Sequence, residues 1–419
     1  MQAVIICGGI GSRLKKVYKK TPKALIKINS IPNLQHIIKD LKKNNINKFL
    51  FLTSFQSNKI ESYVKQIKLK NYCIVKDINL KGTGGALIGA YKKLDKEFLV
   101  IFSDLFMKIN FKKFVIFSRK KKSEVNMFVH ANSHPYDSDT VEYNRDCRVK
   151  KINLKRTNKS KLNIAISGLF YFKKIYIKKF KYENKKKINL DLVKDLISKK
   201  INNRIFAYKS IEYIKDFGTP KRLKKVNFEQ KLSNRKKISA VFLDRDGVIN
   251  KEIGGVTSKE EFIKLPKVEQ AIKKLNQKQI PVFIVSNQAV LSKGKINNAK
   301  FKSIISFLDK LLSKSNAYID DYLYCPFYKG KNYDISKIPY YSKYRKPNPG
   351  MILELSKKHR INLKNSFFVG DSDKDILAGT KVGCKTILVK SNKLFDYKYK
   401  IKPNFFVYNL SEAINIILK

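Results

Sequence analysis

The chain has 419 residues, of which 43% are hydrophobic, so it is long enough for two or three domains that each bury a core. Its 22 Tyr and 27 Phe exclude a disordered or fibrous chain. Five dispersed cysteines without a C-x-x-C pair argue against a disulfide framework and indicate a reducing, cytoplasmic location. No apolar run approaches the roughly 20 residues of a membrane helix, and the run 3–7 is too short for a signal peptide.

The net charge of +57 comes from 90 basic and 33 acidic residues and would suit a nucleic-acid binder. The lysines, however, run from Lys15 to Lys419 instead of forming a local patch. Lys, Asn and Ile are abundant throughout, which is typical of proteins from AT-rich genomes. We therefore expect small-molecule substrates and neither a specific nucleic acid nor a membrane as partner. An oligomer stays open, without support in the sequence.

Short apolar strands alternate with helices in both halves of the chain. In the first half we expect strands at 3–7, 49–53, 73–75 and 98–102, with helices around 37–41 and 86–94. A polar, basic stretch follows, after which strands are expected at 239–243, 282–285, 367–369 and 386–389. This alternation predicts an α/β protein with mostly parallel sheets. We divide it into a domain at 1–228, a basic linker at 229–237 and a domain at 238–419.

A glycine-rich turn follows the first strand, at residues 8–13. Glycines there let backbone N–H groups approach phosphate oxygens, and Arg13 adds a planar, positively charged guanidinium group with several N–H donors. Lys23 follows in a Thr-Pro-Lys segment. The pair G-G-x-G-[ST]-R-L and P-K resembles the sugar-1-phosphate nucleotidyltransferase family, which joins a sugar 1-phosphate to an NTP and releases pyrophosphate.

Further segments resemble this family in the same order, at 81–86, 103–104, 167–170 and 216–220. The resemblance covers residues 1 to about 225 and implies a GT-A-like, three-layer α/β/α domain. It implies that Arg13 holds the leaving phosphates, that Lys23 stabilises the α-phosphoryl oxygens, and that Asp104 and Asp216 bind Mg²⁺. The implied nucleotide-binding residues are Gly8, Gly9, Gly11, Ser12, Gly82, Thr83 and Gly84, and the implied sugar-binding residues are Gly168, Lys155 and Asp191.

The second half begins with an apolar strand that ends in Asp244-Arg245-Asp246-Gly247. The first carboxylate of such a pair can attack phosphorus, and the second can protonate the leaving oxygen. Alone, D-x-D could also be a solvated turn. Three more segments follow in order, at 286–288, 345–350 and 369–373.

This ordered set of motifs resembles the haloacid dehalogenase superfamily, and the motif sequences are closest to those of its heptose-bisphosphate and histidinol-phosphate phosphatase branch. The resemblance implies Asp244 as nucleophile and Asp246 as acid/base. It also implies phosphate contacts by Ser286, Asn287, Arg345 and Lys346, and Mg²⁺ on Asp244, the Asp246 carbonyl and Asp371. The gaps between these segments leave no room for a large cap, so we expect a second Rossmann-like α/β/α domain without one.

A zinc loop often precedes R-K-P in this branch. Cys325 remains here, but Phe327, Ser342 and Tyr344 replace the other ligands. Because a structural zinc site needs about four N/S ligands, we predict that none is bound.

The presence of a nucleotidyltransferase-like and a phosphatase-like domain on one chain would be explained if they catalysed two successive steps. We expect a bifunctional enzyme that dephosphorylates D-glycero-D-manno-heptose 1,7-bisphosphate and couples the 1-phosphate to an NTP, for lipopolysaccharide or another surface polysaccharide. Residues 134–139 resemble guanylyl- and heptose-type transferases, which favours GTP. One alternative keeps both reactions but uses a mannose- or glucose-like sugar phosphate. Another is a nucleic-acid-associated protein with a DNA 3′-phosphatase-like domain, which the charge would suit.

Overall fold

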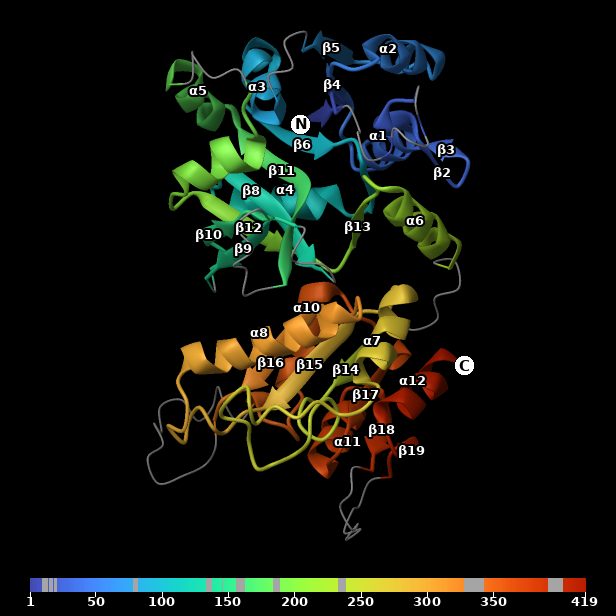
Figure 1. Ribbon diagram of the computed structural model, residues 1–419, viewed down its shortest axis with the longest axis vertical. Helices are drawn as coiled ribbons and strands as arrows, with labels where there is room; N and C mark the ends of the chain where they lie inside the picture. The colour runs from blue at the N-terminus through green and yellow to red at the C-terminus, as the bar shows by residue number, and fades with distance from the viewer. Residues whose placement is uncertain are drawn as a thin grey trace. The chain divides into compact units, whose positions relative to one another are not determined.

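The protein is an α/β protein whose strands form two separate main sheets (Figure 1). The computed structural model describes residues 1–9, 14, 18, 21–77, 82–132, 138–144, 146–155, 163–183, 189–232, 239–327, 343–390 and 402–419. The chain divides into two compact units: the first contains nearly all of Met1–Leu232, and the second contains Ser233–Lys419. In the part of the chain that the structure describes, no helix is both long and apolar enough to cross a bilayer.

The first unit is built on a nine-stranded mixed sheet. Its parallel part has the order β6-β1-β4-β5, formed by Glu97–Phe102, Gln2–Ile6, Lys48–Thr53 and Tyr72–Lys76. The rest contains β8 (Val125–Ala131), β9 (Thr140–Tyr143), β10 (Val149–Asn153), β11 (Ile164–Lys173) and β12 (Ile205–Lys209). Because β11 runs antiparallel to β6, the sheet is less uniformly parallel than the alternation of elements predicts.

Alternate side chains of β1 enter two different cores, which makes this unit three-layered. Ala3 and Ile5 pack in one core with α1 (Asn33–Lys43), α2 (Ser57–Gln66) and α4 (Phe111–Lys120). Val4 and Ile6 pack in the other core, with α3 (Gly82–Gly89), α5 (Lys174–Glu183) and a π-helical turn, η5 (Leu192–Ile197). Burial on both faces explains why β1 reads as a continuous apolar run.

Short elements complete the first unit. They are the 3₁₀ turns η1 (Lys23–Leu25), η2 (Tyr91–Lys93) and η6 (Ser198–Lys200), the hairpin β2 (Lys27–Ile28) and β3 (Ile31–Pro32), the pair β7 (Leu105–Lys108) and β13 (Tyr213–Asp216), and α6 (Pro220–Leu232). The helix expected around 86–94 is therefore two elements, α3 and η2. The start of the proposed linker 229–237 is helical, within α6, and residues 233–238 lie outside the described residues.

The second unit contains a parallel six-stranded sheet. Its order is β16 (Asp321–Cys325), β15 (Val282–Asn287), β14 (Ala240–Leu243), β17 (Ser366–Gly370), β18 (Lys385–Val389) and β19 (Phe405–Val407). One core joins the sheet to α7 (Val268–Gln277), α8 (Asn298–Lys314) and α12 (Leu410–Leu418). The described part of this unit also contains α10 (Gly350–His359), α11 (Asp373–Thr380) and a 3₁₀ turn, η9 (Leu363–Asn365). Residues 245–281 hold loops and α7, so no cap domain is inserted there.

Strand order reverses at one place in each sheet. In the second unit the chain passes from β14 to β15 and β16 on one side and to β17, β18 and β19 on the other. In the first unit β4 and β5 lie on one side of β1, and β6 lies on the other. Ligands in such sheets bind beyond the carboxyl ends of the strands at this reversal. We therefore expect ligand-binding residues directly after β1, β6, β14 and β17.

Gly168 in β11 allows a close approach between neighbouring strands. A β-carbon added there would lie 2.7 Å from the Phe102 ring. We expect Gly168→Ala to lower the free energy of unfolding by about 1–3 kcal/mol because the ring must shift. Urea unfolding would measure the loss. Gly89→Ala is the control: nothing lies within 4 Å of that added carbon, so the change should be neutral or stabilise by up to about 1 kcal/mol. Equal losses would contradict the packing argument.

Candidate functional site

Two neighbouring strands of the second unit each end in an aspartate. Asp244 follows β14 and Asp371 follows β17, and these strands pair in parallel, with Leu243 opposite Val369. Asp375, in the first turn of α11, completes an acidic cluster. One ligand oxygen from each of the three carboxylates lies within 4.8 Å of the others. The strand pairing therefore brings the aspartates of two distant segments to one place.

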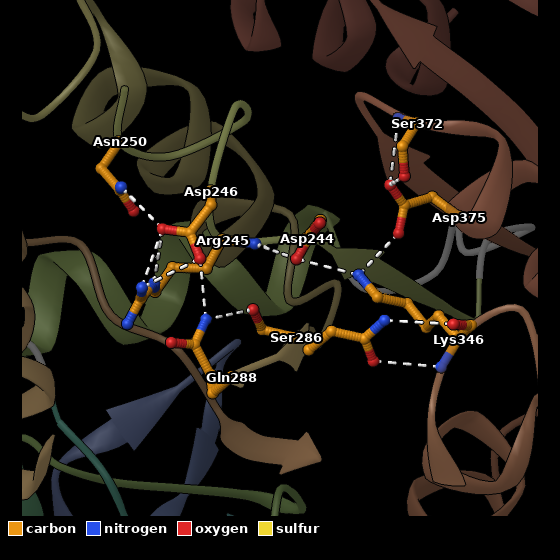
Figure 2. A network of polar contacts seen from close by, with 10 residues as sticks. Asp244, Arg245, Asp246, Asn250, Ser286, Gln288, Lys346, Ser372 and Asp375 are labelled. Atoms are coloured by element: carbon orange, nitrogen blue, oxygen red, sulfur yellow. Dashed lines mark hydrogen bonds and ion pairs between the residues drawn. The ribbon is translucent and has the colours of Figure 1, made fainter. Parts of the chain in front are cut away.

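A buried lysine compensates this acidic cluster. The Lys346 Nζ lies 2.9 Å from Oδ1 of Asp244 and 2.6 Å from Oδ1 of Asp375 (Figure 2). Its side chain is only 2% exposed. Burial alone would lower the pKa of Lys346, but the two carboxylates raise it above its ordinary value. The lysine is therefore a fixed positive charge beside Asp244.

The carboxyl group of Asp244 is strongly perturbed. Burial raises its pKa from 3.8 to about 8. Lys346 opposes this rise, whereas the nearby carboxylates of Asp375, Asp371 and Asp246 add to it. A second positive charge at the cluster would favour the ionised form, which is the form that can act as a nucleophile.

Hydrogen bonds fix the position of Lys346. The amide of Asn287, at the end of β15, donates to the Lys346 carbonyl at 3.1 Å and accepts from the Lys346 N–H at 3.0 Å. Asp375 is held from the other side, because the N–H and hydroxyl of Ser372 donate to its Oδ2 at 3.1 and 2.6 Å. Asn287 was expected to bind phosphate directly; in this structure its amide holds the lysine. Arg345, also expected at the phosphate, donates to the Phe327 carbonyl at 2.5 Å.

Three donors that the motif analysis did not single out surround the Asp246 carboxylate (Figure 2). Arg245 donates to both Asp246 oxygens at 2.8 to 3.1 Å. Asn250 donates to Oδ1 at 2.8 Å, and Gln288 donates to Oδ2 at 2.7 Å. The same Gln288 nitrogen lies 2.7 Å from the Ser286 hydroxyl. Gln288 thus connects the expected acid/base to an expected phosphate contact.

The burial of Arg245 could not be anticipated from its side chain. Arginine is rarely fully buried, yet Arg245 is 0% exposed and lies between the two aspartates of the D-x-D motif. Its pairing with Asp246 offsets the cost of burying both charges. The adjacency of Gln288 to Ser286 and Asn287 was the one sequence signal that could have drawn attention to this network.

The acidic cluster of the second unit fits a hard divalent cation. Carboxylate oxygens are the ligands that Mg²⁺ prefers, and Asp244, Asp371 and Asp375 bring three together. Asp375 is the least available of them, because its oxygens already pair with Lys346 and Ser372. Gly247 leaves room for this arrangement, because an added β-carbon would lie within 1.9 Å of Oδ2 of Asp371. Asp244 and Asp371 were expected as metal ligands, whereas Asp375 was not.

Cys325, the one zinc-loop ligand of the related phosphatases that this chain keeps, lies at the end of β16. Cys325 is 1% exposed, and burial raises the pKa of its thiol. Its carbonyl accepts a hydrogen bond from the Gln288 N–H at 2.7 Å. Phe327 and Tyr344 are described, whereas Ser342 lies outside the described residues. That no zinc binds stays a prediction.

In the first unit, Lys23 and Asp104 form an ion pair beyond the ends of β1 and β6. The Lys23 Nζ lies 2.8 Å from Oδ2 of Asp104. The same nitrogen would be 4.0 Å from a β-carbon on Gly9, so the lysine reaches the start of the glycine-rich turn. The Gly8 carbonyl accepts a hydrogen bond from the Ser54 hydroxyl at 2.5 Å. Gly11, Ser12 and Arg13 lie outside the described residues.

The second expected metal ligand, Asp216, is brought beside Asp104 by strand pairing. Asp216 ends β13, opposite Leu105 of β7, and the Phe217 N–H donates to the Asp104 carbonyl at 3.0 Å. The Arg222 guanidinium pairs with Oδ1 of Asp216 at 2.6 Å. The two aspartates thus lie on adjacent backbone segments, and their carboxylates are of the hard oxygen type that Mg²⁺ prefers.

The expected nucleotide- and sugar-binding residues are only partly brought together. Leu192 N–H donates to the Thr83 hydroxyl at 2.9 Å, and Gly84 N–H donates to the Leu190 carbonyl at 2.8 Å. Gly82 has φ +75°, which suits glycine. Asp191 lies 3.5 Å from the Thr83 hydroxyl, but its other oxygen caps η5 by accepting from the N–H groups of Val193 and Lys194.

Lys155 and Gly168 have local contacts of their own. The Lys155 N–H donates to Oδ1 of Asp139 at 2.9 Å, and Gly168 packs against Phe102. The cap formed by Asp191 and the packing of Gly168 give each a structural reason for its identity. Their roles toward a sugar stay predictions.

Comparison with known proteins separates the two halves in the same way. Residues 2–232 match the family model described as Nucleotidyl transferase, and residues 343–413 match the HAD-hydrolase-like model. A D-glycero-alpha-D-manno-heptose-1,7-bisphosphate 7-phosphatase of Photorhabdus laumondii is 36% identical over 37% of this chain and 84% of its own length. The D-glycero-beta-D-manno-heptose-1,7-bisphosphate 7-phosphatase of Escherichia coli K12 is 31% identical over 38% and 82%. A solved structure of HddC from Yersinia pseudotuberculosis, complexed with GMP-PN, matches 54% of this chain and 97% of its own, at 22% identity and a TM-score of 0.46.

The acidic cluster should make stability depend on pH in the metal-free protein. Asp244 takes up its proton more readily when folded, so its contribution to stability falls as the pH rises from about 4 to about 8. In excess EDTA, the melting temperature of Asp244→Asn should exceed that of the wild type by at least about 2–4 °C near pH 8, the shift that about 1 kcal/mol gives. The difference should shrink near pH 5. Scanning fluorimetry across this range would measure it, and a pH-independent difference would contradict the assignment.

Proposed function

We propose one two-step function for this chain, which belongs to the nucleotidyl transferase family through its first half and to the heptose-bisphosphate phosphatases through its second. The chain is an enzyme with both transferase and phosphatase activities. The phosphatase half would remove the 7-phosphate of D-glycero-D-manno-heptose 1,7-bisphosphate. The transferase half would then couple the heptose 1-phosphate to an NTP and release pyrophosphate. The observation that carries the phosphatase step is the position of Lys346 between Asp244 and Asp375.

In the phosphatase step, the Asp244 carboxylate attacks the phosphorus of the 7-phosphate. The bond to the sugar oxygen breaks, and that oxygen takes a proton from Asp246. Water then hydrolyses the phosphoaspartate, with Asp246 accepting the proton of the attacking water. Lys346 and Ser286 hold the phosphoryl oxygens. A bound Mg²⁺, held by Asp244, Asp371 and the Asp246 carbonyl, would offset the charge of the phosphate.

In the transferase step, the sugar phosphate attacks the α-phosphorus of the NTP and pyrophosphate leaves. Lys23 stabilises the α-phosphoryl oxygens, and Arg13 holds the β- and γ-phosphates. The backbone around Gly8 and Gly9 cradles the triphosphate. Asp104 and Asp216 would hold Mg²⁺, which would offset charge in the transition state. We take GTP as the donor because residues 134–139 resemble guanylyl- and heptose-type transferases; those at 134–137 lie outside the described residues.

The sequence relatives support heptose bisphosphate as the substrate of the first step. Several relatives named as heptose-1,7-bisphosphate 7-phosphatases are at least 30% identical, and the chain spans 78 to 84% of their lengths. Removing the 7-phosphate leaves the 1-phosphate that a nucleotidyltransferase needs as its acceptor. The product of the second half is thus chemically the substrate of the first.

Gln288 should matter for the phosphatase step alone. Gln288→Leu removes the donor that Asp246 and Ser286 share, so the acid/base and the phosphate contact lose their common support. We expect phosphatase kcat to fall by about 10- to 100-fold. Phosphate release from the bisphosphate would measure this loss, and pyrophosphate release by the same protein is the internal control. An unchanged phosphatase rate, or equal losses in both activities, would contradict the assigned role.

The two-step proposal can be tested in one mixture. The protein is incubated with Mg²⁺, heptose 1,7-bisphosphate and all four NTPs, and mass spectrometry follows phosphate, pyrophosphate and sugar nucleotides. We expect a GDP-heptose, and we expect it to disappear with either Asp244→Asn or Asp104→Asn. Added heptose 1-phosphate should restore it for Asp244→Asn only. Pyrophosphate release with a mannose or glucose 1-phosphate, but none with heptose, would replace the heptose with another sugar.

A further inference from the structure

Asn33 lies between two segments of the proposed transferase site without belonging to either. It is the first residue of α1 and is 0% exposed. Its Nδ2 donates to the Ser103 carbonyl at 2.9 Å and to the Leu105 carbonyl at 2.8 Å. These two carbonyls flank Asp104 in the chain. Both protons of the amide are therefore used to hold the turn that carries the aspartate.

The backbone of Asn33 is tied to the lysine segment. Its N–H donates to the Ile26 carbonyl at 3.0 Å, and Ile26 directly follows the 3₁₀ turn Lys23–Leu25. One residue thus connects the segment that carries Lys23 to the turn that carries Asp104. The 2.8 Å ion pair between Lys23 and Asp104 spans the same two segments.

We propose that Asn33 is a positioning residue for nucleotidyl transfer, which fixes Asp104 and Lys23 relative to each other. This inference rests on the proposed roles of those two residues. Leu105 also pairs with Asp216 across β7 and β13, so a turn released at Leu105 would displace the second metal-binding carboxylate as well. A displacement of about 1 Å in such a site can lower a rate by about 100-fold.

The amide oxygen of Asn33 indicates that a contribution to stability alone does not explain why asparagine occupies this position. Its Oδ1 is buried and has no hydrogen-bond partner among the described residues. A buried acceptor without a partner destabilises the folded protein. The reverse orientation would place this oxygen against the carbonyls of Ser103 and Leu105, so the contacts themselves fix which way the amide points.

A second buried asparagine offers a matched control. Asn126 in β8 is also 0% exposed, donates to the Ser118 hydroxyl at 2.9 Å and leaves its Oδ1 without a partner among the described residues. Ser118 lies on α4, so this pair connects a strand to a helix of the core. Asn33 and Asn126 therefore share burial and an unpaired oxygen, but only Asn33 contacts the Asp104 turn.

The test compares Asn33→Leu with Asn126→Leu in the full chain. For Asn33→Leu we expect kcat of pyrophosphate release to fall by about 10- to 100-fold, with KM for the NTP changed by less than about 3-fold. Phosphatase activity should be unchanged. Asn126→Leu should lower the melting temperature to a similar extent and leave kcat within about 3-fold. If Asn33→Leu does not fold, Asn33→Ser replaces it in the test. This variant keeps one donor, so we expect a loss of kcat between those of the wild type and a variant without a donor.

Metal binding gives a readout that does not depend on turnover. In an Asp371→Asn background, Mn²⁺ binding with a non-hydrolysable GTP analogue is followed by electron paramagnetic resonance. Asn33→Leu should weaken Mn²⁺ binding by about 10-fold, the effect typical of losing an outer-shell partner, and Asn126→Leu should not.

The controls separate two kinds of failure. If Asp104→Asn retains full nucleotidyl transfer, the proposed site itself is wrong. If Asp104→Asn abolishes transfer while Asn33→Leu loses no more than Asn126→Leu in rate and in Mn²⁺ binding, the role of Asn33 is overturned and the proposed site stands.

Discussion

The contact between Lys346 and two carboxylates is the constraint around which the second unit is organised. Asp244 and Asp371 follow neighbouring strands, and Asp375 lies close to them in the first turn of α11. Burial and the neighbouring carboxylates raise the pKa of Asp244 and so oppose its ionisation. One buried ammonium group offsets part of that charge. Its position depends on Asn287 from β15 and on Asp375 from α11, so strand, loop and helix must all be in place before the nucleophile has its environment.

Both units contain a lysine–aspartate ion pair near the ends of their strands, and the two pairs differ in their exposure to solvent. Each places a lysine against an aspartate beyond the strand ends at which the strand order reverses. In the second unit the pair Lys346 and Asp244 is almost buried, at 2% and 12% exposure. In the first unit Lys23 and Asp104 are 19% and 24% exposed. A small phosphoryl group and a triphosphate with its sugar partner require sites of different size, and this difference in exposure is consistent with that.

Features fixed by local sequence could be predicted. The strands ending at Leu243 and Gly370, and the aspartates that follow them, could be found because apolar runs and D-x-D spacing are local signals. The juxtaposition of Asp104 and Asp216 was expected from family resemblance and not from spacing. The antiparallel pairing of β11 with β6 was not expected, because an isolated strand pattern carries no direction.

Features that depend on tertiary contacts could not be predicted. Asn33 reads as an ordinary polar residue at a helix start, and only the packing of α1 against the Asp104 turn gives it two carbonyl partners. Arg245 reads as a surface cation, yet it is enclosed with Asp246. Asp191, expected at the sugar, caps η5, which no motif indicated.

The identity of Asp244 as the group that becomes phosphorylated is the claim on which the account depends most. It can be measured directly in a single turnover of the bisphosphate with enzyme in excess. The reaction is quenched with acid before the intermediate hydrolyses, and the peptides are analysed by mass spectrometry. The account predicts a phosphoryl group on the peptide that contains Asp244 and none after Asp244→Asn. A phosphoryl group on Ser286, or complete turnover without any phosphorylated peptide, would contradict it.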